Sequence, residues 1–436
     1  MRSLLFLMLG LAALAGCAQN VRQVSIGDLE HFKIMPVYYV TDRKDTHDAN
    51  LNKRFDAERA QVSYGISSIA IPSSYPKAQV PSFLHWNLSL KRDPYKNLAL
   101  LAMDNYSEQL FFRQLNQTGA NRALIFIHGF NTPFERANRI SAKLNYDLDF
   151  NGPIILFSWP SLATTTRYAA DEANLAWSEP DFEHLLINLF EQTDLQVNLM
   201  AHSLGNRALT NTLIRLLDDH PEWIQRINAV ILAAPDIDAG NFERFIGPEL
   251  TQYGLPMTLY TSSNDLALRL SRRIHKNPRA GEAGDFIIVL PGMDTIDASL
   301  AEAELLGHEY YYQGPHAVAD LHQWLVQGIH VEQRKYLKKI PLNDGYYWQL
   351  QPFDYPVKTL ISICFSKIAG APIGSLKFLG SKEESMACTL RRYGVTDSGC
   401  YHRKPAANGL LSLNARMCPR EQTENIQIRY VDSVNN

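Results

Sequence analysis

Six short apolar runs, separated by helix-like stretches, constrain the fold of this chain more than any other feature of its sequence. The runs are 123–128, 153–158, 196–201, 228–234, 256–261 and 285–290. Short runs of this kind are typical of strands that are buried on both faces of a parallel sheet. Their alternation with helical stretches predicts an α/β fold, with a mostly parallel sheet flanked by helices.

The remaining elements follow from periodicity and turn formers. Residues 36–41 and 63–72 are rich in β-formers and are expected to be strands, and a helix is expected around 107–117. In 204–219, leucine and alanine recur at helical spacing, which indicates a helix with one buried face. The helices expected between and after the apolar runs are 132–149, 180–193, 204–219, 240–246, 264–274 and 315–329.

The first seventeen residues have the pattern of an export signal. Residues 4–14 are almost wholly apolar, are too few to span a bilayer, and lead into Leu14-Ala-Gly-Cys17. The segment resembles a bacterial lipoprotein signal, which implies that Cys17 carries lipid at the mature N-terminus. A plain secretory signal cut near Ala18 is the alternative. Residues 18–34 are expected to be a polar tether.

The lipid would be the only membrane anchor, because no second apolar stretch reaches the roughly 18 residues that a membrane helix needs. By the same resemblance, the absence of Asp at position 18 favours the outer membrane of a bacterial cell envelope. The net charge of −3 gives no reason to expect a nucleic-acid partner.

The other four cysteines all lie in the last quarter of the chain. An even number of cysteines in a short segment of an exported protein indicates two disulfides, although the sequence does not decide their pairing. A zinc site is the alternative, but there is no C-x-x-C pair. We therefore expect a main α/β domain over 35–335 and a small disulfide-containing C-terminal module over 345–436. The four residues are Cys364, Cys388, Cys400 and Cys418.

The clearest chemical motif is M-A-H-S-L-G-N at residues 200–206, where an expected strand meets an expected helix. A nucleophile elbow holds its serine in a strained turn, so the residues two before and two after must be small. Here these are Ala201 and Gly205, and Ser203 is the candidate nucleophile. An ordinary serine cap of a helix is the alternative.

An oxyanion-binding turn is expected at H-G-F-N, residues 128–131, after an earlier strand. In this arrangement the turn provides one backbone N–H, and the residue after the nucleophile provides the other. The expected donors are Leu204 and either Phe130 or Asn131. His128 precedes the elbow and is interpreted as a structural histidine.

The acid and the base should follow the nucleophile in the order Ser, acid, His. Asp265 lies just past the strand 256–261 and is the preferred acid, with Asp236 and Asp238 as alternatives. His308 lies past the last expected strand and is the preferred base. His316 is its alternative.

These motifs, taken in order with S-W-P at 158–160, A-P-D-I-D at 234–238, S-S-N-D at 262–265 and G-H-E-Y-Y at 307–311, resemble a bacterial α/β-hydrolase family. The family is of esterase/lipase type and is known as a domain of unknown function (DUF nine hundred). V-Y-Y-V-T-D-R at 37–43 also looks like its N-terminal part. The resemblance covers roughly 35–330 and implies Ser203 as nucleophile, Asp265 as acid and His308 as base.

The sequence therefore predicts a serine hydrolase that cleaves a small acyl ester or a lipid-like substrate without a metal ion or an organic cofactor. A non-catalytic binding lipoprotein on the same scaffold is one alternative. A serine peptidase or thioesterase is the other. Aromatic residues near expected loop ends could line an acyl pocket or belong to the core; they are Phe130, Trp159, Tyr168 and Tyr310.

Overall fold

The computed structural model describes residues 31–73, 75, 98–162, 167–300, 308–342 and 345–352. It also describes the backbone of three strands that form a separate sheet in the order β12–β13–β14: β12 (Ile361–Lys367), β13 (Asp397–Pro405) and β14 (Leu411–Met417).

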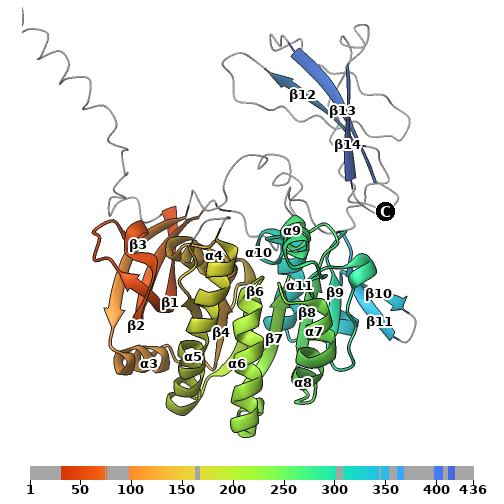
Figure 1. The fold of residues 1–436 in the computed structure, drawn as a ribbon. Coiled ribbons are helices and arrows are strands. Elements are labelled where there is room, and N and C mark those ends of the chain that lie inside the picture. Colours follow the sequence, from red (N-terminus) through yellow and green to blue (C-terminus); the bar gives the residue numbers. More distant parts are fainter. Residues whose placement is uncertain are drawn as a thin grey trace, which may run out of the picture.

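An eleven-stranded sheet forms the centre of the fold, in the order β10–β11–β9–β8–β7–β6–β4–β5–β1–β2–β3 (Figure 1). The strands from β11 to β1 in this order pair in parallel, whereas β10, β2 and β3 pair antiparallel with their neighbours. The strands are β1 (Phe32–Asp45), β2 (Phe55–Pro72), β3 (Ala99–Tyr106), β4 (Arg122–Ile127), β5 (Ile154–Ser158), β6 (Gln196–His202), β7 (Ile227–Ala233), β8 (Met257–Thr261), β9 (Asp294–Asp297), β10 (Leu337–Leu342) and β11 (Gly345–Leu350).

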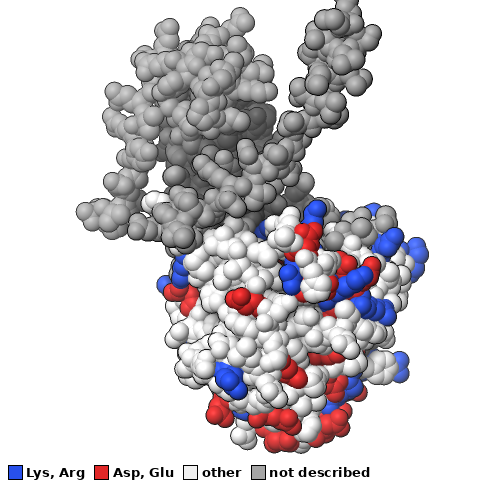
Figure 2. All heavy atoms as spheres, turned by 90° about the vertical axis from the view of Figure 1, so that its left-hand side faces the viewer, with Lys and Arg blue, Asp and Glu red and all other residues white. Residues whose placement is uncertain are grey.

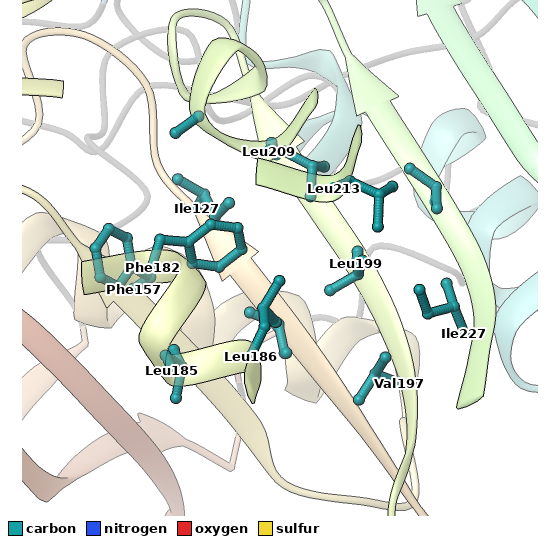
Figure 3. Packing of buried hydrophobic residues seen from close by; sticks show 14 of the residues in the cluster. Ile127, Phe157, Phe182, Leu185, Leu186, Val197, Leu199, Leu209, Leu213 and Ile227 are labelled. Atoms are coloured by element: carbon teal, nitrogen blue, oxygen red, sulfur yellow. The ribbon is translucent and has the colours of Figure 1, made fainter. Parts of the chain in front are cut away.

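Helices cover the sheet and pack on it through apolar faces. Figure 3 shows Leu185 and Leu186 of one helix and Leu209 of the next beside Val197 and Leu199 of β6. Burying one such side chain contributes about 1.5–3 kcal/mol, so these faces fix the helices on the sheet. The helices are α3 (Glu108–Gln117), α4 (Phe134–Leu148), α5 (Tyr168–Gln192), α6 (Gly205–Asp219), α7 (Ala239–Asn241), α8 (Gly247–Thr251), α9 (Leu266–His275), α10 (Tyr310–Gln313) and α11 (Pro315–Leu325).

The predicted fold class is confirmed, but one predicted strand is wrong. Residues 285–290 do not form a strand: Gly284–Phe286 is a short 3-10 helix, and the sheet strand is β9 at Asp294–Asp297. Within 285–290 only Ile288 is buried, and its carbonyl accepts a hydrogen bond from the Thr295 hydroxyl at 2.7 Å. The apolar run therefore lies beside the sheet, while a short strand with acidic ends enters it.

The sheet is also wider than predicted at both edges. β3 is an edge strand without a buried residue, and the sequence analysis assigned no strand to it although residues 99–103 are apolar. At the other edge β10 and β11 form a hairpin, and β11 pairs in parallel with β9 through Trp348 and Ile296. Residues 345–350 thus belong to the main sheet rather than to a separate C-terminal module.

The predictions at the two ends of the chain fall largely outside the described residues. Cys17, Cys388 and Cys418 are not among them, and the expected tether is described only from residue 31 onward. In the register of β12 and β13, Cys364 lies opposite Cys400. The disulfides and the lipid anchor stay predictions. None of the described helices is both long and apolar enough to cross a membrane.

On the face seen in Figure 2, basic and acidic side chains lie among large uncharged areas. Acidic residues gather at the lower end of this view. The described part of this face therefore has no continuous basic surface of the kind that binds a nucleic-acid backbone.

Candidate active site

Ser203 lies at a sharp turn between β6 and α6. Its φ of 52° is in the left-handed region, which is strained for any residue other than glycine. Backbone hydrogen bonds hold the turn: the Ser203 N–H donates to the Ala233 carbonyl at 2.9 Å, and the Ser203 carbonyl accepts from the Asp236 N–H at 3.1 Å. A Cβ at Gly205 would lie 2.5 Å from the His128 carbonyl oxygen, so this turn needs glycine there.

His308 lies within hydrogen-bond distance of both Ser203 and Asp265, although the three residues are far apart in the sequence. His308 Nε2 is 2.9 Å from Ser203 Oγ, and His308 Nδ1 is 2.7 Å from Asp265 Oδ2. Because a carboxylate only accepts, the proton of neutral His308 belongs on Nδ1, which leaves Nε2 free to accept from the serine hydroxyl. The structure thus brings together the three residues that the sequence analysis preferred.

Both carboxylate oxygens of Asp265 have partners. Asp265 is fully buried and caps α9, where Oδ1 accepts the Leu268 N–H at 2.9 Å while Oδ2 faces His308. Burial alone would lower the pKa of His308, but the Asp265 carboxylate outweighs it and raises that pKa above its ordinary value. The imidazole is therefore better able to carry a proton than an isolated buried histidine.

The two alternative acids have other partners. Burial would raise the pKa of Asp236, but the ion pair with Arg279, at 2.7 Å between Nε and Oδ1, lowers it. Asp236 also accepts from the hydroxyls of Ser271 and Tyr168. Asp238 caps α7 through the Asn241 N–H at 2.9 Å. Neither carboxylate bonds to a histidine among the described residues.

The alternative base, His316, is buried in the first turn of α11. Among the described histidines, His308 is the one bonded to the serine hydroxyl.

The H-G-F-N turn lies directly against the serine. A Cβ at Gly129 would be 2.9 Å from Ser203 Cβ, so the close approach needs glycine. Burial raises the pKa of the Asp171 carboxyl, and a hydrogen bond from the Asn131 N–H opposes that shift, so this N–H already has a partner. The N–H groups of Phe130 and Leu204 make no hydrogen bond with the described residues. Of the three expected donors, these two are the ones that remain available.

Arg43, which the sequence analysis gave no role, is fully buried behind this turn. Its Nη2 donates to the Thr132 carbonyl at 2.8 Å and to His128 Nε2 at 3.3 Å, and its Nε donates to Ser158 Oγ at 3.0 Å. Nη1 reaches the Ser161 carbonyl at 3.2 Å. Arg43 therefore ties the end of β1 to the loops after β4 and β5.

His128 is neutral within this network. Burial, followed by the nearby Arg43 charge, lowers its pKa to about 3. Since Nε2 accepts from Arg43, Nδ1 carries the proton and donates to the Gly129 carbonyl at 2.9 Å. The structural role predicted for His128 agrees with these contacts.

Replacing Arg43 with methionine is expected to lower the free energy of unfolding by on the order of 3 kcal/mol or more, because each buried acceptor left without a donor costs about 1–3 kcal/mol. Urea unfolding followed by circular dichroism measures the change. Arg59→Met is the matched control, because Arg59 is partly exposed and bonds to a single side chain, Asn174. An unchanged midpoint for Arg43→Met would contradict the proposed network.

His202, the residue before the serine, is a second residue near the site to which the sequence analysis gave no role. Its Nε2 lies 3.0 Å from the His308 carbonyl oxygen, and its ring packs between those of His308 and Tyr311. Burial lowers the pKa of His202 well below its ordinary value, so it is neutral. It holds the loop that carries His308.

The aromatic residues expected near the site are buried in the core or half-buried against it where the structure describes their side chains. Trp159 is fully buried and stacks on His128, so it belongs to the core. The rings of Phe130 and Tyr168 pack against each other at 5.1 Å. The side chain of Tyr310 lies outside the description. Two cavities, of about 370 and 450 Å³, lie at the amino-terminal ends of the central strands, around Arg122 and Asn228, and not at Ser203.

Among curated proteins none matches this chain by sequence. An esterase of Pyrobaculum calidifontis resembles it with a TM-score of 0.24 and 11% identity, over 48% of this chain and 76% of that chain. A thermophilic carboxylesterase cloned from a metagenomic library has a TM-score of 0.25 and 10% identity, over 61% and 85%. The phospholipase PlaB of Legionella pneumophila has a TM-score of 0.26 and 11% identity, over 56% and 74%.

The family match is the more informative comparison. Residues 104–324, about half of the chain, match the family described as "Alpha/beta hydrolase of unknown function (DUF900)". The match includes the turn at Ser203, the H-G-F-N turn, Asp265 and His308, and it begins after the V-Y-Y-V-T-D-R stretch. The predicted resemblance is confirmed: the chain belongs to this family of α/β-hydrolases of unknown function.

Proposed function

We propose that this chain is a serine hydrolase that cleaves acyl esters through a covalent acyl-enzyme. The observation that carries the proposal is the continuous hydrogen-bonded chain from Ser203 Oγ through the His308 imidazole to Asp265, with steps of 2.9 and 2.7 Å. A serine, an imidazole and a buried carboxylate in this relation are the parts that nucleophilic acyl transfer requires. Membership of an α/β-hydrolase family supports the same reading.

In the proposed mechanism, Ser203 Oγ attacks the ester carbonyl carbon while its proton passes to His308 Nε2. The resulting tetrahedral intermediate collapses, the carbon–oxygen bond to the alcohol breaks, and His308 returns the proton to the departing oxygen. A water molecule then gives a proton to His308 and attacks the acyl carbon of the acyl-enzyme. When this second intermediate collapses, the bond to Ser203 Oγ breaks, His308 returns the proton to that oxygen, and the acid is released. Asp265 keeps the imidazole in the required tautomer and stabilises its charged form.

The N–H groups of Phe130 and Leu204 are the proposed oxyanion donors. Each such donor is worth about 3–4 kcal/mol in comparable sites. Leu204 directly precedes α6, so the positive end of that helix adds to the stabilisation of the anion. Gly129 supports this proposal because the lack of a Cβ lets the H-G-F-N turn lie directly against Ser203.

The cellular setting is proposed from the sequence alone. Export and lipidation at Cys17 would tether the enzyme to the bacterial envelope, with the outer membrane favoured by Ala18. Metabolic labelling with a fatty-acid analogue tests this: label on the wild-type protein and none on Cys17→Ser supports the anchor.

A fluorophosphonate probe tests the enzyme directly. Because such a probe reacts with activated serines, we expect a stable adduct on Ser203. We expect none on Ser263, a partly exposed serine just after the carboxyl end of β8. Peptide mass spectrometry identifies the labelled position. Folded protein that takes no label at Ser203 would refute the proposal and leave a binding protein on a hydrolase scaffold. A panel of matched ester, thioester and amide substrates then separates an esterase from a thioesterase or a peptidase.

A further inference from the structure

Helix α9 exposes an apolar stripe next to the proposed catalytic acid. Leu266, Leu270 and Ile274 follow one another at intervals of four residues, so they share one helix face. Their exposed fractions are 42%, 57% and 56%, while Leu268 and Ser271 on the opposite side are buried. Single exposed leucines are ordinary, but three on one short helix form a surface that calls for an explanation.

Cations flank this stripe. Arg269, Arg273 and Lys276 are exposed, and none of the three makes an ion pair with a described residue. At 100° per residue they lie along one side of the apolar stripe, and α9 contains no acidic residue. A fourth cation, Arg272, packs at 4.7 Å over the ring of Phe286, itself 37% exposed. An apolar stripe beside unpaired cations is the pattern of a helix that lies in an anionic lipid surface.

The position of α9 relates this surface to the proposed active site. The helix begins at the residue after Asp265, whose Oδ2 is 2.7 Å from His308 Nδ1. In Figure 1, α9 lies at the same end of the sheet as α10, which follows His308 directly. A surface that covers α9 would therefore lie beside the triad.

We infer that α9 is a docking helix for an anionic lipid surface, and that the substrate is an acyl ester presented at such a surface. The second half of this inference rests on the proposed hydrolase function. A protein partner is a poorer match, because a stable protein interface buries about 800 Å² on each side. A ten-residue helix about 15 Å long with one narrow stripe offers far less. Insertion into a lipid headgroup region needs only a few side chains with cations beside them.

Sedimentation of the full chain with vesicles tests the docking helix. Vesicles of phosphatidylcholine with an equal amount of phosphatidylglycerol are compared with vesicles of phosphatidylcholine alone. We expect the wild-type protein to bind the anionic vesicles and the double variant Leu270→Glu, Ile274→Glu to bind them at least tenfold more weakly, since burying one such side chain is worth about a factor of ten. The matched control is Leu342→Glu on β10, an exposed leucine that lies outside α9. The N-terminal segment is common to all the variants.

A second pair of variants tests the cations. Arg269→Ser with Arg273→Ser is expected to weaken binding to the anionic vesicles and to reduce its dependence on salt, with no effect on the phosphatidylcholine vesicles. Hydrolysis of a water-soluble p-nitrophenyl ester should be unchanged in both α9 variants, whereas hydrolysis of an ester carried in anionic vesicles should fall.

These experiments distinguish a failure of the docking inference from a failure of the proposed catalytic function. Ser203→Ala is expected to bind the vesicles as the wild-type protein does, so the binding result stands even if no ester is cleaved. Wild-type protein that does not sediment with anionic vesicles would overturn the inference. So would unchanged binding of the double glutamate variant, or light scattering that shows a dimer abolished by the same two substitutions.

Discussion

Replacing Ser203 with alanine is expected to lower kcat for a p-nitrophenyl ester by roughly a million-fold. The alanine lacks the oxygen that forms the acyl-enzyme, so His308 has no nucleophile to activate. The residual rate should come only from water that reacts within the oxyanion turn. Single-turnover assays at high enzyme concentration, with the titrated active-site content of the wild-type protein as reference, measure the loss.

The same substitution should leave the fold intact. Alanine and serine bear the left-handed φ of 52° at similar cost, and the backbone bonds of residue 203 to Ala233 and Asp236 do not depend on the side chain. The hydroxyl loses one hydrogen bond, to His308, so the free energy of unfolding should change by less than about 1.5 kcal/mol.

Ser141→Ala is the matched control for this experiment. Ser141 is a buried serine whose hydroxyl bonds to the Ala137 carbonyl within α4, away from the triad. Its removal should leave kcat unchanged. If Ser203→Ala kept an appreciable part of the wild-type rate, the nucleophile would be another group, and the function proposed here would be wrong.

The centre of the fold could be predicted because its strands are buried on both faces. Five apolar runs, from 123–128 to 256–261, correspond to β4, β5, β6, β7 and β8. The edges could not be predicted in this way. β3 begins with five apolar residues, but it has one partner strand and no buried residue, so it does not belong to the strands buried on both faces that this pattern predicts. β9 combines one fully buried isoleucine with acidic residues at both ends, so it presents no apolar run. The predicted strand was therefore placed at the apolar run 285–290 instead of at β9.

The candidate site was predictable where chemistry fixes the order of residues. Ser203, Asp265 and His308 follow from an elbow, a strand end and the chain order of an α/β-hydrolase triad. Spacing could not exclude Asp236, because it also follows a strand; its partner Arg279 is 43 residues away. Spacing also could not indicate the role of Arg43, because its partner His128 is 85 residues away. Tertiary packing decides which buried polar groups contact one another. The periodicity of the sequence does not indicate these contacts.

Replacing Asp265 with asparagine is expected to lower kcat by about ten-thousand-fold while leaving the stability almost unchanged. Asparagine Oδ1 can still accept the Leu268 N–H and cap α9. Its amide, however, would turn an N–H towards His308 Nδ1 and favour the tautomer with the proton on Nε2. Nε2 could then no longer accept the Ser203 proton. Asp265→Ala should lose a similar factor in kcat and, in addition, about 1 kcal/mol of stability with the cap.

The pH profile separates this role from a merely structural one. His308 acts as a base only when neutral, so kcat/KM should rise with pH through the pKa of His308. In the wild-type protein the Asp265 carboxylate raises this pKa, whereas in Asp265→Asn the opposing effect of burial remains. The acid limb of the profile should therefore move to lower pH in the variant, although the maximal rate is far smaller.

Asp238→Asn is the matched control for these measurements. Asp238 also caps a helix, through the Asn241 N–H, and its carboxylate bonds to no histidine in the described part of the chain. It should keep both the rate and the pH profile of the wild-type protein. An Asp265→Asn enzyme with an unshifted acid limb would mean that another group sets the pKa of the base. Full activity of Asp265→Asn would show that Asp265 is not the acid of the triad. Loss of activity in Asp238→Asn instead would place the acid at the strand end after β7.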